Sequence, residues 1–236
     1  MALPRLDSPK YDLTIPSTGE KVKFRPYLVK EEKILMMAIE SEDTRQMMTA
    51  VKDVIRSCTE DAIDIDKLAM FDLEYVFTQL RSKSVGEVST ISVKCKECES
   101  KNDVDVDLTK VRVDVPKEKN KTIMLTDSIG VSLRYPSVDT LLNAQADDQK
   151  SDVDRVFDVI ISSIDSIYSN DTVYDASEQP YDELKEFVES LNTNQFNDIR
   201  EFIENIPTAA IGVEFKCISC GHDNAFDVKG LGNFFE

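Results

Sequence analysis

Two short stretches, residues 93–98 (VKCKEC) and residues 215–220 (FKCISC), decide which fold this chain can adopt. Each stretch holds two cysteines separated by two residues, and a lysine, Lys94 or Lys216, precedes the first cysteine. One such pair alone is ambiguous, because it suits a redox dithiol as well as half of a metal site. The interpretation therefore depends on what the two stretches share.

The similarity extends beyond the cysteines. An asparagine, Asn102 or Asn224, follows the second cysteine of each pair by four places, and Asp-Val follows at the same offset in residues 105–106 and 227–228. Alternating residues flank both pairs, which is typical of strands. The pattern predicts a duplicated unit in which a CxxC turn joins two strands, as in a zinc knuckle.

Two facing knuckles would supply four thiolates, the tetrahedral set that structural zinc prefers. The predicted metal ligands are Cys95, Cys98, Cys217 and Cys220. The 118 residues between Cys98 and Cys217 exceed the usual spacer of about 15–20 residues, so this is no plain zinc ribbon. A shared Zn(2+) would act structurally and staple residues 99–216 into a closed loop.

Other readings of the cysteines stay open. They could be two unrelated reduced pairs, a disulfide or a redox site, and the pattern does not distinguish zinc from iron or from an empty site. Thioredoxin-like motifs place CxxC at the start of a helix, whereas here polar turn residues follow each pair. Cys58, the fifth cysteine, lies in a helical pattern and is predicted to be buried.

Charge and composition exclude several classes of protein. The 236-residue chain has a net charge of −17, and residues 141–210 alone hold 16 acidic and four basic residues. Such a surface repels phosphate backbones, so we expect no nucleic-acid partner. There is no apolar run of about 18 residues and no signal peptide, so we expect no membrane association. The odd number of cysteines, five, favours a reducing cytoplasm over a disulfide-bonded secreted protein.

The predicted fold class is α+β, with β-hairpins, two CxxC zinc-knuckle hairpins and two groups of helices, the second inserted between the knuckles. We expect regions 1–90 (hairpin and helices), 91–136 with 208–236 (knuckle β region) and 137–207 (acidic helices), together one compact unit. Hydrophobic periodicity predicts hairpins at 11–28 and around 127–128 and strands at 87–94, 103–108, 111–116 and 172–174. It predicts one helix that starts at residue 29, a second that starts after the N-cap Asp43, and further helices over 66–82, 137–145, 151–168, 180–191 and 194–205. A final strand is expected to hold Phe234 and Phe235, which could instead contact a partner.

No motif indicates catalysis, and we expect neither an enzyme nor a small-molecule substrate. His222 is the only histidine, so no histidine-based triad is available. It could compete as a metal ligand, but it is better explained as a turn residue, because the cysteines already supply four ligands. No glycine-rich phosphate-binding loop and no GxSxG motif occur.

Several long stretches resemble a known family: KYDLTIPSTGEKVKFRPYLVKEEK (10–33), FDLEYVFTQLRSKSVGE (71–87) and VEFKCISCGH (213–222), with DSIGVSLRYPS (127–137) in support. Together they resemble the baseplate assembly proteins of T-even-like contractile-tailed bacteriophages, the group that holds a small hub subunit and the hub assembly catalyst. The resemblance covers most of the chain and is clearest over residues 11–98. In this family "catalyst" means an assembly helper, so no catalytic residues carry over.

The resemblance implies a late morphogenesis protein that binds baseplate hub or other tail proteins in the host cytoplasm. The alternatives are a structural hub subunit retained in the virion tail and a zinc-ribbon regulatory protein. Residues 1–30 carry six basic and three acidic residues, against the trend of the chain. This basic hairpin is the candidate partner face, or else an ordinary hairpin packed on the core. Its candidate contacts are Tyr11, Lys21, Lys23, Phe24, Arg25 and Tyr27.

Overall fold

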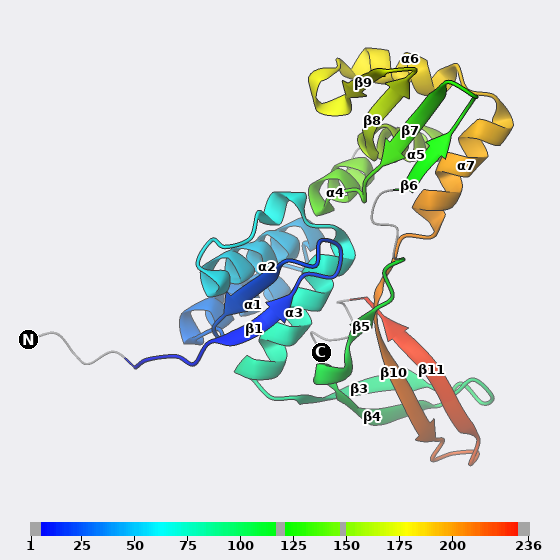
Figure 1. The fold of residues 1–236 in the computed structure, drawn as a ribbon. Coiled ribbons are helices and arrows are strands. Elements are labelled where there is room, and N and C mark those ends of the chain that lie inside the picture. The colour runs from blue at the N-terminus through cyan, green and yellow to red at the C-terminus, as the bar shows by residue number, and fades with distance from the viewer. Residues whose placement is uncertain (1–5, 117–120, 147–149, 231–236) are drawn as a thin grey trace, which may run out of the picture. The chain divides into compact units, whose positions relative to one another are not determined.

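The computed structural model describes residues 6–116, 121–146 and 150–230 and has the expected α+β composition (Figure 1). The chain divides into two compact units, Met1–Asp114 with Thr208–Glu236 and Val115–Pro207. The hairpin near residue 127 falls in the second unit, not with the cysteine hairpins as expected, because its second strand pairs with a strand of that unit. The predicted strand at Phe234 and Phe235 lies outside the described residues.

The first unit combines three long helices with seven strands among its described residues. Its helices are α1 (Val29–Glu40), α2 (Thr44–Thr59) and α3 (Met70–Ser84), with short 3₁₀ helices at Ile65–Lys67 and Leu108–Lys110. Its strands are β1 (Tyr11–Thr14), β2 (Lys21–Phe24), β3 (Val88–Lys94), β4 (Lys101–Asp107), β5 (Arg112–Val113), β10 (Ala209–Lys216) and β11 (Asp223–Lys229).

The predicted first hairpin and the helices after it are confirmed. β1 and β2 pair antiparallel, and their alternation buries Leu13, Val22 and Phe24. Asp43 caps α2 as expected, because its carboxylate accepts hydrogen bonds from the backbone amides of Arg45 (2.8 Å) and Gln46 (3.1 Å).

A buried carboxylate ties the first hairpin to α3. Asp72 is fully buried and accepts hydrogen bonds from the amides of Ser17 (2.9 Å), in the hairpin turn, and Ala69 (3.3 Å), at the start of α3. The helix is predicted to start at residue 66, but α3 begins at Met70, because a separate 3₁₀ turn precedes it. Burial raises the pKa of Asp72 above its ordinary value, against the effect of these hydrogen bonds.

A second buried carboxylate, Glu31, lies in the first turn of α1 and is only 2% exposed. It accepts hydrogen bonds from Arg25 Nη2 (2.9 Å), Ser57 Oγ (2.9 Å) and the amide of Leu28 (2.8 Å). Burial alone would raise the pKa of Glu31, but these donors outweigh it and lower the pKa to about 2. This ion pair joins the end of the first hairpin to α1 and α2.

Besides the β1–β2 hairpin, the strands of the first unit form two small sheets that share a core. β3 pairs with β4, and a three-stranded sheet has the order β11–β10–β5. The strand predicted over 111–116 is reduced to the two residues of β5, which pair with the start of β10. Buried side chains from both sheets, including Ile91, Val106, Ile211 and Val213, pack together with Leu108 of the 3₁₀ helix that follows β4.

The second unit has one four-stranded antiparallel sheet, in the order β6–β7–β8–β9, and four helices among its described residues. Its strands are β6 (Lys121–Met124), β7 (Ile129–Leu133), β8 (Ile164–Ser169) and β9 (Thr172–Asp175). Its helices are α4 (Val138–Ala146), α5 (Asp152–Ser162), α6 (Tyr181–Glu189) and α7 (Thr193–Glu204), with a 3₁₀ turn at Ala176–Glu178.

The prediction of one long helix over 151–168 is wrong. α5 ends at Ser162, and the chain turns into β8, an inner strand between β7 and β9. The amide of Ser163 and its hydroxyl both bond to the carbonyl of Val159, which closes the helix. Ile164 then continues the buried core with Val131, Ile160 and Ile161.

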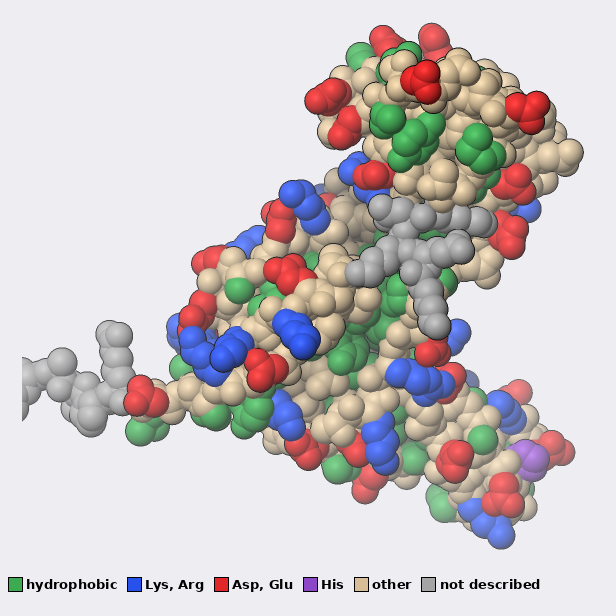
Figure 2. All heavy atoms as spheres, viewed as in Figure 1, with side chains coloured by type: hydrophobic (Ala, Val, Ile, Leu, Met, Phe, Trp, Pro, Cys, Tyr) green, Lys and Arg blue, Asp and Glu red, His purple; other side chains and the backbone are tan. Residues whose placement is uncertain are grey.

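Surface charge is uneven, as the sequence indicates. On the face drawn in Figure 2, acidic and basic side chains mix over the first unit, whereas acidic ones predominate on the second. Among the described residues, no helix has both the length and the apolar character needed to cross a membrane.

Breaking the buried ion pair tests its role in holding the first unit together. Arg25→Met should lower the free energy of unfolding by about 3 kcal/mol at pH 7, because Glu31 would keep a buried charge without its main partner. Exposed Arg56→Met is the control and should cost less than about 1 kcal/mol. Denaturant unfolding followed by circular dichroism measures both values.

The cost should depend on pH in a defined direction. The folded-state pKa of Glu31 is about 2 and its ordinary value is 4.5, so its ionised form stabilises the fold fully above pH 4.5. That contribution is lost as the pH falls from 4.5 towards 2. The difference in the free energy of unfolding between the native protein and Arg25→Met should therefore become smaller over that range. A gap that stays constant with pH would contradict this assignment.

Candidate metal centre

The two cysteine pairs lie in the turns of two hairpins with the same hydrogen-bond pattern. In the β3–β4 turn, the amide of Cys95 donates to the carbonyl of Ser100 (2.9 Å), and the amide of Glu99 donates to the carbonyl of Cys95 (3.0 Å). In the β10–β11 turn, the amide of Cys217 donates to the carbonyl of His222 (2.8 Å), and the amide of Gly221 donates to the carbonyl of Cys217 (2.9 Å). The duplication seen in the sequence is therefore a duplication of backbone structure.

Each turn needs one residue in the left-handed backbone region. Glu99 has a φ of 56° and Gly221, the equivalent position, a φ of 74°. Glycine adopts this conformation without steric cost, whereas a glutamate there is uncommon. The tight turns aim amides at sulfur: Glu97 N and Ser219 N lie 3.4 Å from the sulfurs of Cys95 and Cys217.

The structure brings all four predicted ligands together. The four sulfur atoms lie within 4.8 Å of one another, with Cys95 and Cys220 3.7 Å apart and Cys98 and Cys217 3.6 Å apart. These separations are too long for disulfides, whose sulfurs lie about 2.05 Å apart. They match the edge of about 3.8 Å that a tetrahedron of sulfurs has around a metal at about 2.3 Å. The donor set therefore fits a tetrahedral metal ion.

The electrostatics of the cluster favour a bound cation. A hydrogen bond from Ser100 Oγ (3.2 Å), with the amide of Cys220, lowers the pKa of Cys217 to about 5. The pKa of Cys220 is instead raised to about 12: the amide of His222 lowers it, but burial and the neighbouring thiols outweigh that effect. Thiolates this close repel one another, so a positive ion is needed for all four to ionise together.

Two buried asparagines link the turns crosswise. Asn224 Oδ1, in β11, accepts from the amide of Lys96 (2.9 Å) in the other turn, and Asn102 Oδ1, in β4, accepts from the amide of Ile218 (3.0 Å). Each side-chain amide also donates to a carbonyl of its own turn: Asn102 Nδ2 to Ser100 (2.9 Å) and Asn224 Nδ2 to His222 (3.1 Å). Both asparagines are 3% exposed. Each hairpin therefore fixes the turn of the other.

The sequence displayed these asparagines at matching offsets but gave no role to them, and it gave no signal for Ser100. The Ser100 hydroxyl lies 3.1 Å from the sulfur of Cys98 and 3.2 Å from that of Cys217. His222 is exposed, and its side chain is not part of the cluster of possible ligands found among the described residues. Its contribution is the carbonyl that closes the turn.

The structure separates the predicted partner-face residues into two groups. Lys21 and Lys23 project from β2 into solvent. Phe24 is 2% exposed and packs near the Tyr11 ring, and Arg25 is held by Glu31. The remaining candidate, Tyr27, is partly buried. Of the six candidates, only the two lysines are exposed, and Tyr11, Arg25 and Tyr27 are partly buried.

Two comparisons with known proteins each match nearly the whole chain. A family model described as "T4 bacteriophage base plate protein" matches residues 8–236. The chain is also similar to the "Baseplate hub assembly protein gp26" of Enterobacteria phage T4, with 24% identity over 229 residues, 96% of this chain and 97% of that protein. No solved structure matches significantly.

Removing one asparagine should disturb the opposite turn. Asn224→Ala and Asn102→Ala should each lower the free energy of unfolding by about 1–3 kcal/mol, because a buried amide loses its acceptor. Hydrogen exchange should accelerate at Lys96 N–H in the first variant and at Ile218 N–H in the second. Asn205→Ala, at an exposed helix end, is the control. Faster exchange confined to the hairpin that carries the substitution would contradict the crosswise arrangement.

Proposed function

Because the chain belongs to the T4 bacteriophage base plate protein family, we propose that it is a non-enzymatic factor that assembles the baseplate hub through protein–protein contacts. The observation that carries the proposal is its similarity, over 96% of its length, to a protein named for hub assembly. The proposed partners are hub or other tail proteins. The proposed site of action is the host cytoplasm.

We further propose that Cys95, Cys98, Cys217 and Cys220 form two zinc knuckles that hold one structural Zn(2+). The sulfur separations of 3.6 and 3.7 Å and the amides aimed at Cys95 and Cys217 support this. Four protein ligands leave no open position for water, so the ion would stabilise the fold and do no chemistry. All-thiolate ligation favours zinc or iron over harder metals.

The runner-up function is a structural hub subunit that stays in the virion tail. Mass spectrometry of purified tails separates the two: a stoichiometric amount of this chain indicates a subunit, and its absence indicates a factor that leaves after assembly. The word "assembly" in the name of the T4 relative favours the second outcome.

Metal analysis tests the zinc site. The native protein should contain about one zinc per chain, and Cys217→Ser should lose it together with cooperative unfolding of the first unit, because three ligands do not close the site. Cys58→Ala provides a matched control, because Cys58 is also a buried free cysteine but lies outside the cluster. It should keep the zinc. Native protein purified without zinc or iron, yet folded, would disprove the metal site.

Charge reversal tests the basic hairpin as a contact with the hub. Lys21→Glu with Lys23→Glu should reduce the number of hubs assembled by a phage that lacks the native protein, while the circular dichroism spectrum stays unchanged. Arg25 is left intact, because changing it would break the buried pair with Glu31. Exposed Lys67→Glu with Lys110→Glu is the control. Normal assembly by the first double variant would show that this hairpin is not the contact.

A further inference from the structure

Helix α1 has an unusual distribution of apolar and charged side chains. Its buried residues are Glu31, Leu35 and Ala38, so one of the three is charged. Its exposed residues include five large hydrophobic ones: Val29 (79% exposed), Ile34 (44%), Met36 (56%), Met37 (61%) and Ile39 (40%). A surface helix normally shows the reverse pattern, with apolar side chains inside. Such a concentration of exposed apolar surface is typical of an interaction site.

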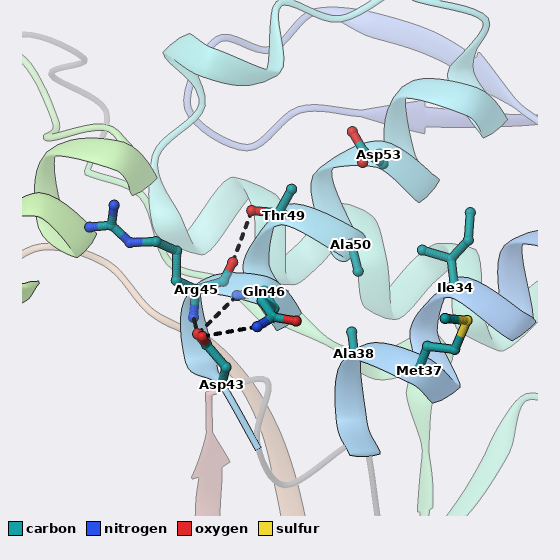
Figure 3. A pocket seen from close by; sticks show the side chains of 9 residues that line it. All are labelled: Ile34, Met37, Ala38, Asp43, Arg45, Gln46, Thr49, Ala50 and Asp53. Carbon is teal, nitrogen blue, oxygen red and sulfur yellow. Dashed lines mark hydrogen bonds between the residues drawn. The ribbon is translucent and has the colours of Figure 1, made fainter. Parts of the chain in front are cut away.

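A groove between α1 and α2 adjoins this surface (Figure 3). Its volume is about 570 Å³, and its apolar lining comes from Ile34, Met37 and Ala38 of α1 and Ala50 of α2. In Figure 3, Ala38 and Ala50 lie on the facing sides of the two helices. Both side chains are small and almost fully buried.

The polar rim of the groove is hydrogen-bonded within itself. The Asp43 carboxylate accepts from Gln46 Nε2 (3.2 Å), and Thr49 Oγ1 donates to the carbonyl of Arg45 (2.9 Å). The Asp53 carboxylate accepts a hydrogen bond from Arg56 Nη1 (3.2 Å). Because these polar groups already have hydrogen-bond partners within the protein, apolar contact would supply most of the binding free energy of a ligand.

Methionines are concentrated in the two helices that form the groove, and one of them, Met37, lines it. Four of the seven methionines of the chain, Met36, Met37, Met47 and Met48, fall within α1 and the start of α2. Methionine side chains are flexible and polarizable, so surfaces rich in them adapt to the apolar face of a bound helix. The groove therefore fits an amphipathic helix better than a rigid small molecule.

The surrounding charge specifies the flanks of that helix. Glu40, at the end of α1, and Glu42 and Asp43, in the turn after it, are exposed, and Asp53 lies on the rim. Arg45 is the one basic residue among the nine that line the groove, and the exposed Lys30 and Lys33 lie nearer the start of α1. A partner with basic flanks would complement these carboxylates. A second copy of this chain, with its net charge of −17, would be repelled.

We propose that the groove between α1 and α2 is the docking site for an amphipathic helix of another protein, which inserts apolar side chains and carries basic residues along its flanks. The identity of that protein as a tail component rests on the proposed function. The docking chemistry itself is independent of it.

Peptide binding by the purified full chain tests the docking site. The probe is a fluorescein-labelled 18-residue leucine–lysine peptide designed as an amphipathic helix, and its affinity is measured by fluorescence anisotropy. Ile34→Gln and Met37→Gln should each weaken binding at least tenfold. Met124→Gln is the matched control, because Met124 is also 61% exposed but lies in β6 of the second unit. A peptide with glutamate in place of lysine should bind at least tenfold more weakly.

Three outcomes would overturn the proposal: no peptide binding, equal binding by the groove variants and Met124→Gln, or self-association of the native chain that Met37→Gln abolishes. Hub assembly by the Met37→Gln variant separates this inference from the proposed function. If the variant loses the peptide and assembles hubs normally, the groove binds a helix but has no part in assembly, so the assignment of the partner as a tail component fails while the docking site and the proposed function stand.

Discussion

The crosswise fixing of two cysteine turns is the constraint on which the first unit depends. Two hairpins more than a hundred residues apart in the chain place their sulfurs 3.6 and 3.7 Å from one another, and each supplies a buried asparagine to the other turn. The acceptor of the Lys96 amide and that of the Ile218 amide each lie in the opposite hairpin. The hydrogen bonds and the thiols thus act together, because the same contact that satisfies the backbone also sets the positions of the possible metal ligands.

Local signals in the sequence predicted much of this arrangement. The repeat of cysteine, asparagine and Asp-Val identified a duplicated turn, and the cap at Asp43 fixed the start of α2. These features depend on neighbouring residues, which a sequence displays directly. The acceptors for Lys96 and Ile218 lie 128 and 116 residues away, so the reason for the matched asparagines could not be read from either segment alone.

The failed prediction of a helix through residue 168 has a similar cause. Ile160, Ile161 and Ile164 continue a helical spacing, but Ile164 belongs to a strand held between β7 and β9. Pairing with distant strands outweighed the local periodicity. The pattern of α1 misleads in the opposite way. Its hydrophobic residues predicted a helix correctly, yet many of them face solvent, and Glu31 holds one of the three buried positions because Arg25 neutralises it.

The short strand β5 has a consequence for how the family can diversify. The chain leaves the first unit after Asp114 and returns at Thr208, and the adjoining residues, Val113 and Ala209, are paired in one antiparallel ladder. The second unit is therefore an insertion whose two ends are neighbouring strands, the geometry of an ordinary hairpin connection. Evolution can enlarge, shrink or replace such an insertion without altering the host fold, because both junctions are already closed by backbone hydrogen bonds.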